Sequence, residues 1–565
     1  MSDFFGSFVL VLHSHLPYVL HHDRMDEDWL MEAAAETYIP LLNALYNLVG
    51  EGISPKITIG LSPILAEQLR HPHFRNEFKK YCDMKIEYAE HDRSGFAHQD
   101  PHMEWLAEMW ADFYRGVKKE FQEKFFEDLV GSFRWLQDQG HVEIITCGAT
   151  HGYFPMLGND VSIQAQVKMA TRSYGEMFGH GPRGIWLPEC GYRPAGRWPN
   201  PLPHRSWETP QNRKGVDEFL SENDLEFFIV DHHQTMKAAP ANLNKSPMET
   251  YFLSAAQIPK KPVTVFSRDI ELSRQVWEHD VGYPGDSVYL DFHKRHAEGK
   301  HRYWKITHAK LDMQYKHKYY PDDAFRQRVQ EHAGNYKWRI KEALKNHYDQ
   351  TGKPTLIMTA FDAELFGHWW FEGPTFLYYL LKWISFDPEI RTETCSQYLD
   401  RQPAYDYIHL PESSWGSHYD SSTWNNPQVY WAWDRIYSAE HEIQDLARRY
   451  AHLMWDEPFR RIVRQTIREL MMLEASDWEF MITNCSTRDH AERRVVEHHE
   501  DFKRLLSMAW RWAAGQGGNI SQEEWQFLSA AEWRNGGVFH EPELWWYEKL
   551  EVPSPRNGHG TGISD

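Results

Sequence analysis

Gly184-Ile-Trp-Leu-Pro-Glu-Cys-Gly-Tyr192 predicts a short buried strand that is followed by a sharp turn. Its first residues are apolar and have the length of a strand interior. Pro188 ends that strand and fixes the direction of the next side chain, Glu189. Gly191 lets the backbone bend away at little steric cost. The stretch therefore indicates a carboxylate presented at the C-terminal edge of a buried strand.

The same pattern, an apolar run that closes on polar residues, recurs along the chain. Such runs are typical of strands buried on both faces of a parallel sheet, and helical patterns separate most of them. We therefore predict an incomplete (β/α) barrel, with an open doubly wound sheet as the alternative. The strands are expected at residues 8–12, 56–60, 142–147, 184–187, 226–230, 263–266 and 355–360.

Ionisable residues follow these expected strands, where a barrel gathers the strand ends at one mouth and builds its active site. One such residue could be accidental, but their recurrence at successive strand ends favours a functional site. They are His13, His15, His151, Glu189, Asp231, Arg268 and Asp362.

The helical patterns divide the chain into parts. We predict a catalytic barrel over residues 1–400, with a helical insertion at about residues 71–140 that is rich in Trp, Phe, Lys and Glu. Residues 401–552 are predicted to form a helix-rich C-terminal domain, which opens with an aromatic and polar loop. The tail at residues 553–565 is rich in Gly, Ser and Pro and is expected to be loose.

Composition excludes several classes of function. The 565 residues carry 61 Lys and Arg against 81 Asp and Glu, a formal net charge of −20, so nucleic acid is not an expected partner. The five cysteines are scattered without a CxxC pair, which fits a reducing compartment. We see no signal peptide and no membrane-spanning run, and expect a cytoplasmic protein.

Two acids at strand ends, Glu189 and Asp362, suggest a glycosidase-type pair, in which one carboxylate attacks a sugar carbon and the other carboxyl group protonates the leaving oxygen. Two solvated acids are the plain alternative. His13 and His15 lie two residues apart and would point the same way from a strand. A His-x-His pair also occurs in metal-dependent barrel hydrolases, so a metal site is the rival interpretation.

Aromatic residues are abundant, with 25 Trp, 28 Tyr and 30 Phe. They fit either a large core or flat platforms on which sugar rings stack. Three tryptophans lie in segments that are polar enough to favour a platform, namely Trp277, Trp415 and Trp424.

At the level of motifs, the chain resembles glycoside hydrolase family 57. The resemblance is carried by His13-Ser-His-Leu-Pro17, by Trp186-Leu-Pro-Glu-Cys-Gly-Tyr192 and by Thr359-Ala-Phe-Asp-Ala-Glu-Leu-Phe-Gly-His368. Within the family, Ala475-Ser-Asp-Trp478 and the segment from Phe266 to Asp286 are similar to the 1,4-α-glucan branching enzymes. The resemblance implies an α/β fold with an incomplete (β/α)7 barrel, a helical insertion and a helix-rich C-terminal domain that contributes to the glucan cleft.

The resemblance also implies roles for individual residues. Glu189 would be the nucleophile and Asp362 the general acid and base of a retaining transglycosylase, which cleaves α-1,4 bonds and forms α-1,6 branches in amylose or glycogen-like glucan. No metal or organic cofactor is implied, and a monomer or small homo-oligomer is expected. Residues expected to contact glucan or line the cleft are Arg268, Gly285, Trp415, Asp477, Trp277, Trp424, His13, His15 and His151.

One departure from the branching-enzyme pattern concerns the loop after the fifth expected strand. The resemblance places a tyrosine there, which would keep water from the glycosyl-enzyme, but this chain has Met236, and the next tyrosine is Tyr251. The alternatives are therefore a family 57 4-α-glucanotransferase, an α-amylase-type hydrolase, or a glucan-binding protein with weak turnover.

Overall fold

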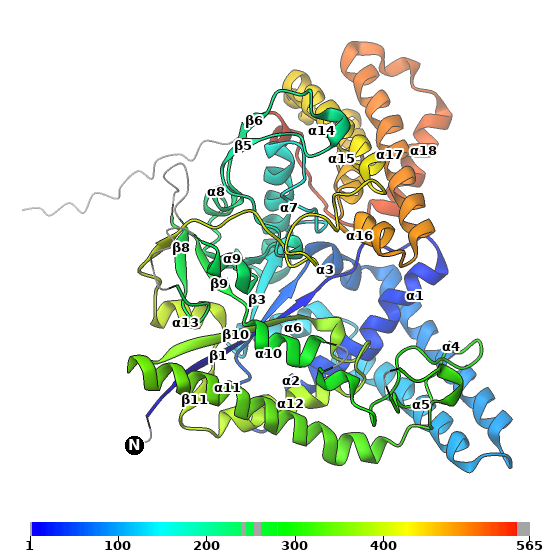
Figure 1. The fold of residues 1–565 in the computed structure, drawn as a ribbon. Coiled ribbons are helices and arrows are strands. Elements are labelled where there is room, and N and C mark those ends of the chain that lie inside the picture. Colours follow the sequence, from blue (N-terminus) through cyan, green and yellow to red (C-terminus); the bar gives the residue numbers. More distant parts are fainter. Residues whose placement is uncertain (1–2, 239–244, 254–260, 279–280, 309, 551–565) are drawn as a thin grey trace, which may run out of the picture.

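A single mixed sheet forms the centre of the computed structural model, which describes residues 3–238, 245–253, 261–278, 281–308 and 310–550. All seven predicted strands are present and mutually parallel where they pair, and they lie in the order β10-β1-β2-β3-β4-β7-β9. Figure 1 shows the strands at the centre of the molecule with helices around them. Their bounds are β1 Gly6–Ser14, β2 Ile57–Leu61, β3 Val142–Cys147, β4 Gly184–Trp186, β7 Phe227–Val230, β9 Thr264–Ser267 and β10 Thr355–Asp362.

The sheet curves into an incomplete barrel, which confirms the predicted fold class. Among the described residues, β9 and β10 do not pair as strands, so the barrel is not closed by a ladder there. The backbone N–H of Asp269, just after β9, donates a hydrogen bond of 2.8 Å across this gap to the carbonyl of Met358 in β10. Short edge strands that the sequence did not predict extend the sheet: β8 (Tyr251–Leu253) is antiparallel to β9, β12 (Tyr407–Ile408) pairs with β8, and β11 (Ile390–Thr392) pairs with β1.

Helices surround the barrel, and their starts follow local signals. The hairpin helices α4 and α5 both have proline at their start, where a missing N–H costs nothing, and the side chain of Asp100 caps α5. Those of the barrel and insertion are α1 (Arg24–Ala33), α2 (Ile39–Gly50), α3 (Pro63–Arg70), α4 (Pro72–Phe96), α5 (Pro101–Lys119), α6 (Leu129–Asp138), α7 (Asp160–Phe178), α8 (Val216–Glu222), α9 (His232–Met236), α10 (Ile270–Trp277), α11 (Val329–Thr351), α12 (Gly373–Ser385) and α13 (Cys395–Arg401).

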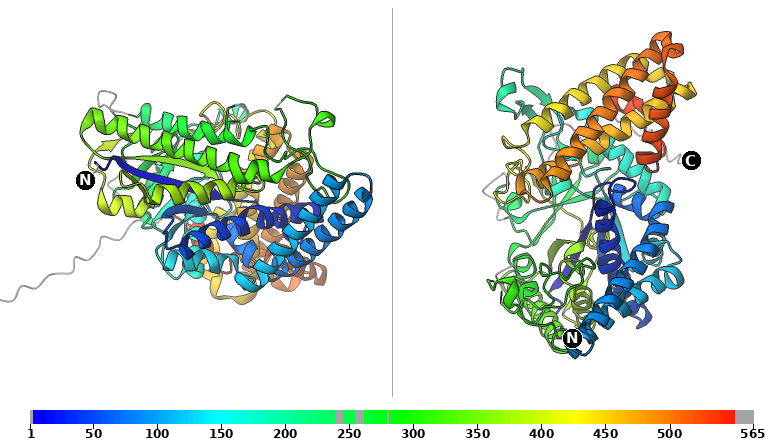
Figure 2. Two further views of the ribbon diagram at one scale, coloured as in Figure 1. Left: turned by 90° about the horizontal axis from the view of Figure 1, so that it is seen from below. Right: turned by 90° about the vertical axis from the view of Figure 1, so that its right-hand side faces the viewer.

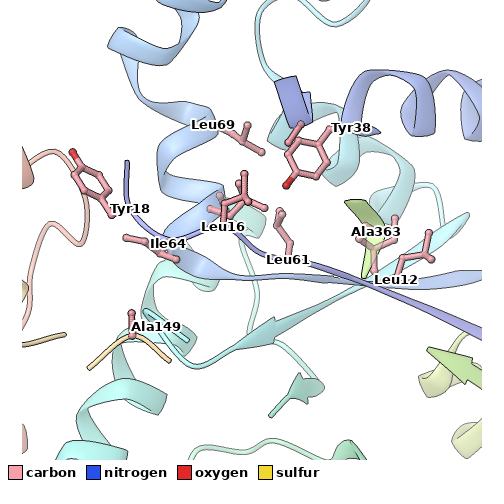
Figure 3. Close-up of a cluster of buried hydrophobic side chains, with 14 of the residues drawn as sticks. Leu12, Leu16, Tyr18, Tyr38, Leu61, Ile64, Leu69, Ala149 and Ala363 are labelled. Atoms are coloured by element: carbon pink, nitrogen blue, oxygen red, sulfur yellow. The ribbon is translucent and has the colours of Figure 1, made fainter. Parts of the chain in front are cut away.

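The core continues from the sheet into the segment that follows β1. Leu16, just beyond the strand, lies with Leu61 at the end of β2 and Ile64 of α3, while Leu12 in the strand lies beside Ala363, and all these side chains are buried (Figure 3). Burying such a side chain contributes about 1.5–3 kcal/mol. This packing fixes the direction in which the chain leaves β1, directly beyond His13 and His15.

The C-terminal helices pack on one another and extend away from the sheet (Figure 2). They are α14 (Tyr430–Tyr450), α15 (Glu457–Leu473), α16 (Asp477–Asn484), α17 (Arg488–Arg511) and α18 (Gln522–Asn535). The apolar pattern predicts one continuous helix over residues 458–483, but the helix is interrupted after Leu473. The interruption follows from a tertiary contact, because Ala475 forms a β-bridge with Gly152 and the N–H of Ser476 donates to the carbonyl of His151.

Membrane-spanning helices, the cysteines and the C-terminal tail are the remaining features for which the sequence gives an expectation. Among the described residues, no helix has both the length and the apolar character needed to cross a membrane. The five cysteines are all free, and four of them are buried. The tail predicted to be loose, at residues 553–565, lies outside the described residues.

Gly184 offers a test of the sheet packing, because it pairs with Phe227 of the neighbouring strand. A Cβ atom at this position would lie 2.2 Å from the Phe227 ring. We expect Gly184→Ala to lower the free energy of unfolding by about 1–3 kcal/mol, since the ring must shift in a filled core. The measurement is the midpoint of denaturant unfolding.

Gly181→Ala is the matched control, since a Cβ atom there meets no atom within 4 Å. Equal midpoints for the two variants would contradict the packing described for β4 and β7.

Candidate active site

Glu189 lies in a tight turn directly after β4. The residue has left-handed backbone angles (φ 60°, ψ 25°), and Cys190 follows with φ 50°. Such a conformation is uncommon for residues other than glycine and is typical of functional sites that the surroundings hold in place. Gly191 is extended (φ −74°), so the expectation that it supplies the bend is wrong. It is small because a Cβ atom would lie 2.6 Å from the Tyr153 ring.

Two donors from distant segments bind the Glu189 carboxylate. The indole N–H of Trp415 donates to Oε2 at 2.7 Å, and the hydroxyl of Ser476 lies 3.3 Å from Oε1 as a donor. The backbone N–H of Trp415 also donates to the Glu189 carbonyl at 3.0 Å. The Glu189 side chain keeps 15 % of its surface exposed, so the carboxylate is oriented by the protein and still reachable from outside.

Three histidines gather beside this carboxylate. His13 and His151 approach to 3.1 Å through their Nε2 atoms, and the ring of His15 stacks on that of His151 at 3.9 Å. The Nδ1 atom of His151 hydrogen-bonds to the Ser476 hydroxyl at 2.9 Å. His15 Nε2 lies 3.0 Å from Oδ2 of Asp477. The structure thus brings together the histidines predicted from the first and third strands with the C-terminal helical region.

Asp362 is the last residue of β10, and its position in the sheet places it next to His13 of β1. His13, the neighbour of Asp362 in the sheet, approaches His151, and His151 Nδ1 lies 3.8 Å from Oε1 of Glu189. Both acids lie at the same end of the barrel, as the strand pattern predicts. Asp362 is partly exposed, so neither acid is sealed into the core.

The environment perturbs the pKa values of both acids in the same direction. The pKa of Glu189 is raised to about 7, mainly by burial and in part by the nearby charge of Asp477, while the hydrogen bonds from Trp415 and Ser476 limit the rise. Burial, with the neighbouring carboxylates of Glu364 and Glu189, holds the pKa of Asp362 well above its usual range. Two like charges in one site favour a state in which one of the pair is protonated.

The two buried histidines have pKa values shifted in the other direction. Burial, together with the neighbouring imidazoles, holds the pKa values of His13 and His151 well below the usual range. Both rings are therefore neutral at pH 7 and can donate and accept hydrogen bonds.

An aromatic and cationic wall adjoins the acids. Arg268 is salt-bridged to the fully buried Asp231 and lies 5.4 Å from the ring centroid of Trp415. The ring of Trp277 lies 6.3 Å from that of Trp415 and is 48 % exposed. Trp277 and Trp415 thus offer aromatic surface beside the carboxylates, which suits an apolar ring face.

One residue predicted for the cleft, Trp424, is buried, and a second, Gly285, lies in a tight turn. Trp424 is 1 % exposed and stacks on Tyr153 at 4.5 Å, so the expectation that it is an open sugar platform is wrong. The Trp424 carbonyl also accepts a hydrogen bond from the indole N–H of Trp433, which helps to hold the residue beneath the loop that carries Trp415. Gly285 ends a 3₁₀ turn in which its N–H donates to the carbonyl of Gly282 at 3.2 Å, and Tyr283 of the same turn stacks on His332.

The residues considered for the missing tyrosine have clear positions. Met236 is the last residue of α9 and is 55 % exposed, so it can be contacted from solvent. Tyr251 is buried in β8, where its hydroxyl accepts the N–H of Ser246 at 2.8 Å. Tyr251 therefore belongs to the sheet edge and does not replace the expected loop tyrosine. Part of the loop between them, residues 239–244, lies outside the described residues.

Two groups of side chains at the mouth could hold a metal ion on distance alone. One consists of His13, Cys147 and His151, and the other of His15, His151 and Asp477, with ligand atoms within 4.8 Å of one another. Both ring nitrogens of His15 and of His151, and Nε2 of His13, already make hydrogen bonds, whereas the buried Nδ1 of His13 makes none among the described residues. The arrangement therefore fits a network that orients Glu189 without requiring an ion.

Ser476 and Trp186 lie within the motifs of the sequence, but the motifs predict no role for either residue. Ser476 contacts both His151 and Glu189, and the ring of Trp186 stacks on His13 at 4.8 Å. The signal for Ser476 was its position next to Asp477. The fully buried Trp186 had no signal beyond its place at the end of a strand.

Comparison with known families places this geometry in context. A sequence model described as Glycosyl hydrolase family 57 matches residues 9–411, and a second, described as 1,4-alpha-glucan branching enzyme, C-terminal, matches residues 435–547. A 1,4-alpha-glucan branching enzyme of Thermococcus kodakarensis is 36% identical over 519 residues, which cover 90% of this chain and 74% of that protein.

Solved structures agree with these matches. The GH57-type branching enzyme of Pyrococcus horikoshii superimposes with a TM-score of 0.88 and 36% identity, covering 98% of both chains. The alpha-amylase AmyC of Thermotoga maritima superimposes with a TM-score of 0.81 and 26% identity, covering 97% of this chain and 100% of that one.

Proposed function

The chain belongs to glycosyl hydrolase family 57, and we infer on that basis that it is a 1,4-α-glucan branching enzyme. The observation that carries the inference is that Glu189 and Asp362 lie at one end of the barrel, with His13 and His151 beside them, and that the charge of Glu189 helps to raise the pKa of Asp362. Two carboxyl groups so placed can break a glycosidic bond with retention. Amylose and glycogen-like glucan are the proposed substrates.

In the first proposed step, the Glu189 carboxylate attacks C1 of an α-1,4-linked glucose unit. Asp362 donates its proton to the departing O4 atom, and the reducing-end fragment leaves. A covalent glycosyl-enzyme ester remains on Glu189. The raised pKa of Asp362 supports this assignment, because the acid must hold a proton before the bond breaks.

In the second proposed step, Asp362 is ionised and takes the proton of a 6-hydroxyl group on another glucan segment. That oxygen attacks C1, the ester bond to Glu189 breaks, and an α-1,6 branch forms. The neutral imidazoles of His13 and His151 can hold sugar hydroxyls, while His151 and Ser476 keep the Glu189 carboxylate in position.

We propose that the glucan lies along Trp277 and Trp415. Exposed aromatic faces suit the apolar side of a pyranose ring, and Arg268 next to Trp415 supplies hydrogen-bond donors. The Asp477 carboxylate, which His15 holds in place, would accept hydrogen bonds from sugar hydroxyl groups. Gly285 remains a proposed glucan contact on the resemblance alone, and Trp424 is proposed to support the loop that carries Trp415.

A second candidate function is α-1,4 hydrolysis at the same site. The exposed Met236 stands where the resemblance places a tyrosine that shields the intermediate, and the chain is also similar to an alpha-amylase. Water that reaches the glycosyl-enzyme would release a linear product. We therefore propose branching as the main activity, with hydrolysis as the competing outcome.

Further parts of the proposal concern the whole protein. We propose a division near residue 400, supported by one family match that ends at residue 411 and another that starts at residue 435. A cytoplasmic location is proposed because the buried cysteines are unpaired thiols, which a reducing compartment maintains. We propose a monomer or small homo-oligomer.

Removing the nucleophile tests the central assignment. We expect Glu189→Gln to lower both cleavage and branching of amylose by on the order of 10⁴-fold or more, because no ester can form. The measurement is reducing-sugar release together with chain-length analysis after enzymatic debranching.

Glu176→Gln, which changes an exposed glutamate on α7, is the matched control and should keep full activity. Dialysis of the natural enzyme against a strong chelator should also leave turnover intact, and loss of turnover would favour the rival metal-dependent hydrolase. Unchanged branching by the Glu189 variant would remove it as nucleophile.

The hydrogen bond from Ser476 gives a prediction for pH dependence. Activity requires ionised Glu189, whose pKa is about 7, so the rate should fall as pH drops through that value. The Ser476 hydroxyl favours the ionised form. Ser476→Ala should therefore raise this pKa and move the acid limb of the kcat/KM profile to higher pH, by about 0.5–1 unit.

Ser417→Ala, in an exposed part of the loop that carries Trp415, serves as the control. A Ser476→Ala profile that lies on the natural one, or that moves to lower pH, would show that this hydroxyl does not tune the nucleophile.

The position of Met236 predicts how the products divide. We expect Met236→Tyr to lower the ratio of hydrolysis to branching about two-fold or more, because a larger side chain leaves water less room beside the intermediate. Met236→Leu, which conserves volume, should leave the ratio unchanged. The ratio comes from reducing ends and new α-1,6 linkages in one amylose reaction.

A further inference from the structure

A second cluster of metal-binding side chains lies outside the active site, next to the start of α1. It consists of His21, which follows β1, Glu27 in the first turn of α1, and His73 in the first turn of α4. One ligand atom from each of the three lies within 4.8 Å of the other two. The mechanism proposed above uses none of these residues.

Hydrogen bonds already draw the three groups together. The Nε2 atom of His73 lies 2.8 Å from Oε1 of Glu27, and the backbone N–H of His21 donates to the same oxygen at 2.6 Å. The rings of His21 and His73 have centroids 4.0 Å apart. Two imidazoles and one carboxylate thus converge on one point, whereas solvated side chains would spread apart.

The charge balance separates this cluster from another of similar composition. Glu32, Glu36 and His368 also lie close enough to hold an ion, but Arg295 and Arg302 already neutralise the two carboxylates. Among the ion pairs of the described residues, Glu27 has His73 as its partner and no lysine or arginine. A bound cation would supply the positive charge that this carboxylate lacks.

The cluster is also open to an ion from solvent. The side chains of His73 and Glu27 are 26% and 16% exposed, and Trp533 of α18 covers one side of His21 with a ring distance of 4.5 Å. His71 lies nearby, but its Nδ1 atom accepts the N–H of His73 and the group of ligand atoms that lie close together does not include it. One coordination position would therefore be left to water.

We propose that His21, His73 and Glu27 bind one divalent transition-metal ion, of which zinc is the best match. Imidazole and carboxylate are common zinc ligands, and two His with one Glu and a water is a known zinc ligand set. Atoms bound to one zinc ion lie about 3.3 Å apart. Small rotations of the partly exposed His73 and Glu27 side chains bring the ligand atoms to that separation.

The ion would join three parts of the chain. The segment that carries His21 leaves β1 beyond His13 and His15, Glu27 lies at the start of α1, and His73 lies at the start of α4, the first helix of the helical hairpin (Figure 1). An ion that binds the folded state and not the unfolded chain stabilises the fold. The proposed role is thus structural and independent of the proposed catalytic activity.

Zinc titration of the full chain tests the proposal. We expect calorimetry at pH 7.5 to show one site of micromolar affinity and the melting temperature to rise with zinc. His73→Ala and Glu27→Gln should each weaken binding at least ten-fold and remove the thermal shift. Glu27→Gln keeps the size of the side chain and an acceptor for the N–H of His21, so the local fold is preserved.

His91→Ala, which removes an exposed histidine elsewhere on α4, is the matched control and should bind zinc like the natural chain. Anomalous scattering from zinc-soaked crystals should place the ion between His21, His73 and Glu27. No binding at millimolar zinc, equal affinity in all variants, or an ion located only at His15 and His151 would each overturn the proposal.

Discussion

Two hydrogen bonds to one carboxylate hold the barrel and the later part of the chain in a single arrangement. Trp415 binds one oxygen of Glu189 and Ser476 binds the other, and both donors follow the last barrel strand in sequence. Glu189 has a left-handed backbone, which only such surroundings maintain. The barrel supplies the acids, but the orientation of the proposed nucleophile depends on how the C-terminal helices pack.

Electrostatics divides the roles between groups of similar chemistry. Burial raises the pKa values of both Glu189 and Asp362. The charge of Asp477 adds to the rise at Glu189, those of Glu364 and Glu189 add to the rise at Asp362, and hydrogen bonds to Glu189 limit its rise. The buried Asp231 has a different environment, because its partner Arg268 helps to hold the pKa of that carboxyl below the usual range despite the cost of burial. Three acids at the same ends of three barrel strands thus differ by the donors and cations around them.

Much of the fold could be predicted because buried parallel strands are continuous apolar runs, and the polar residues that end them identify the mouth. Features set by distant contacts could not. The interruption before Asp477 arises from the bridge between Ala475 and Gly152, within a pattern that reads as continuous helix. The edge strands are only two or three residues long, and the burial of Trp424 depends on Tyr153, far away in sequence.

The interruption before α16 also has a consequence in time. Ser476 follows Asp362 by on the order of 100 residues, so a growing chain carries both acids for roughly ten seconds before this donor is synthesised. During that interval the proposed nucleophile lacks the hydroxyl that favours its charged form. The order of segments along the polypeptide therefore makes a correctly poised carboxylate one of the last properties that the nascent protein acquires on the ribosome.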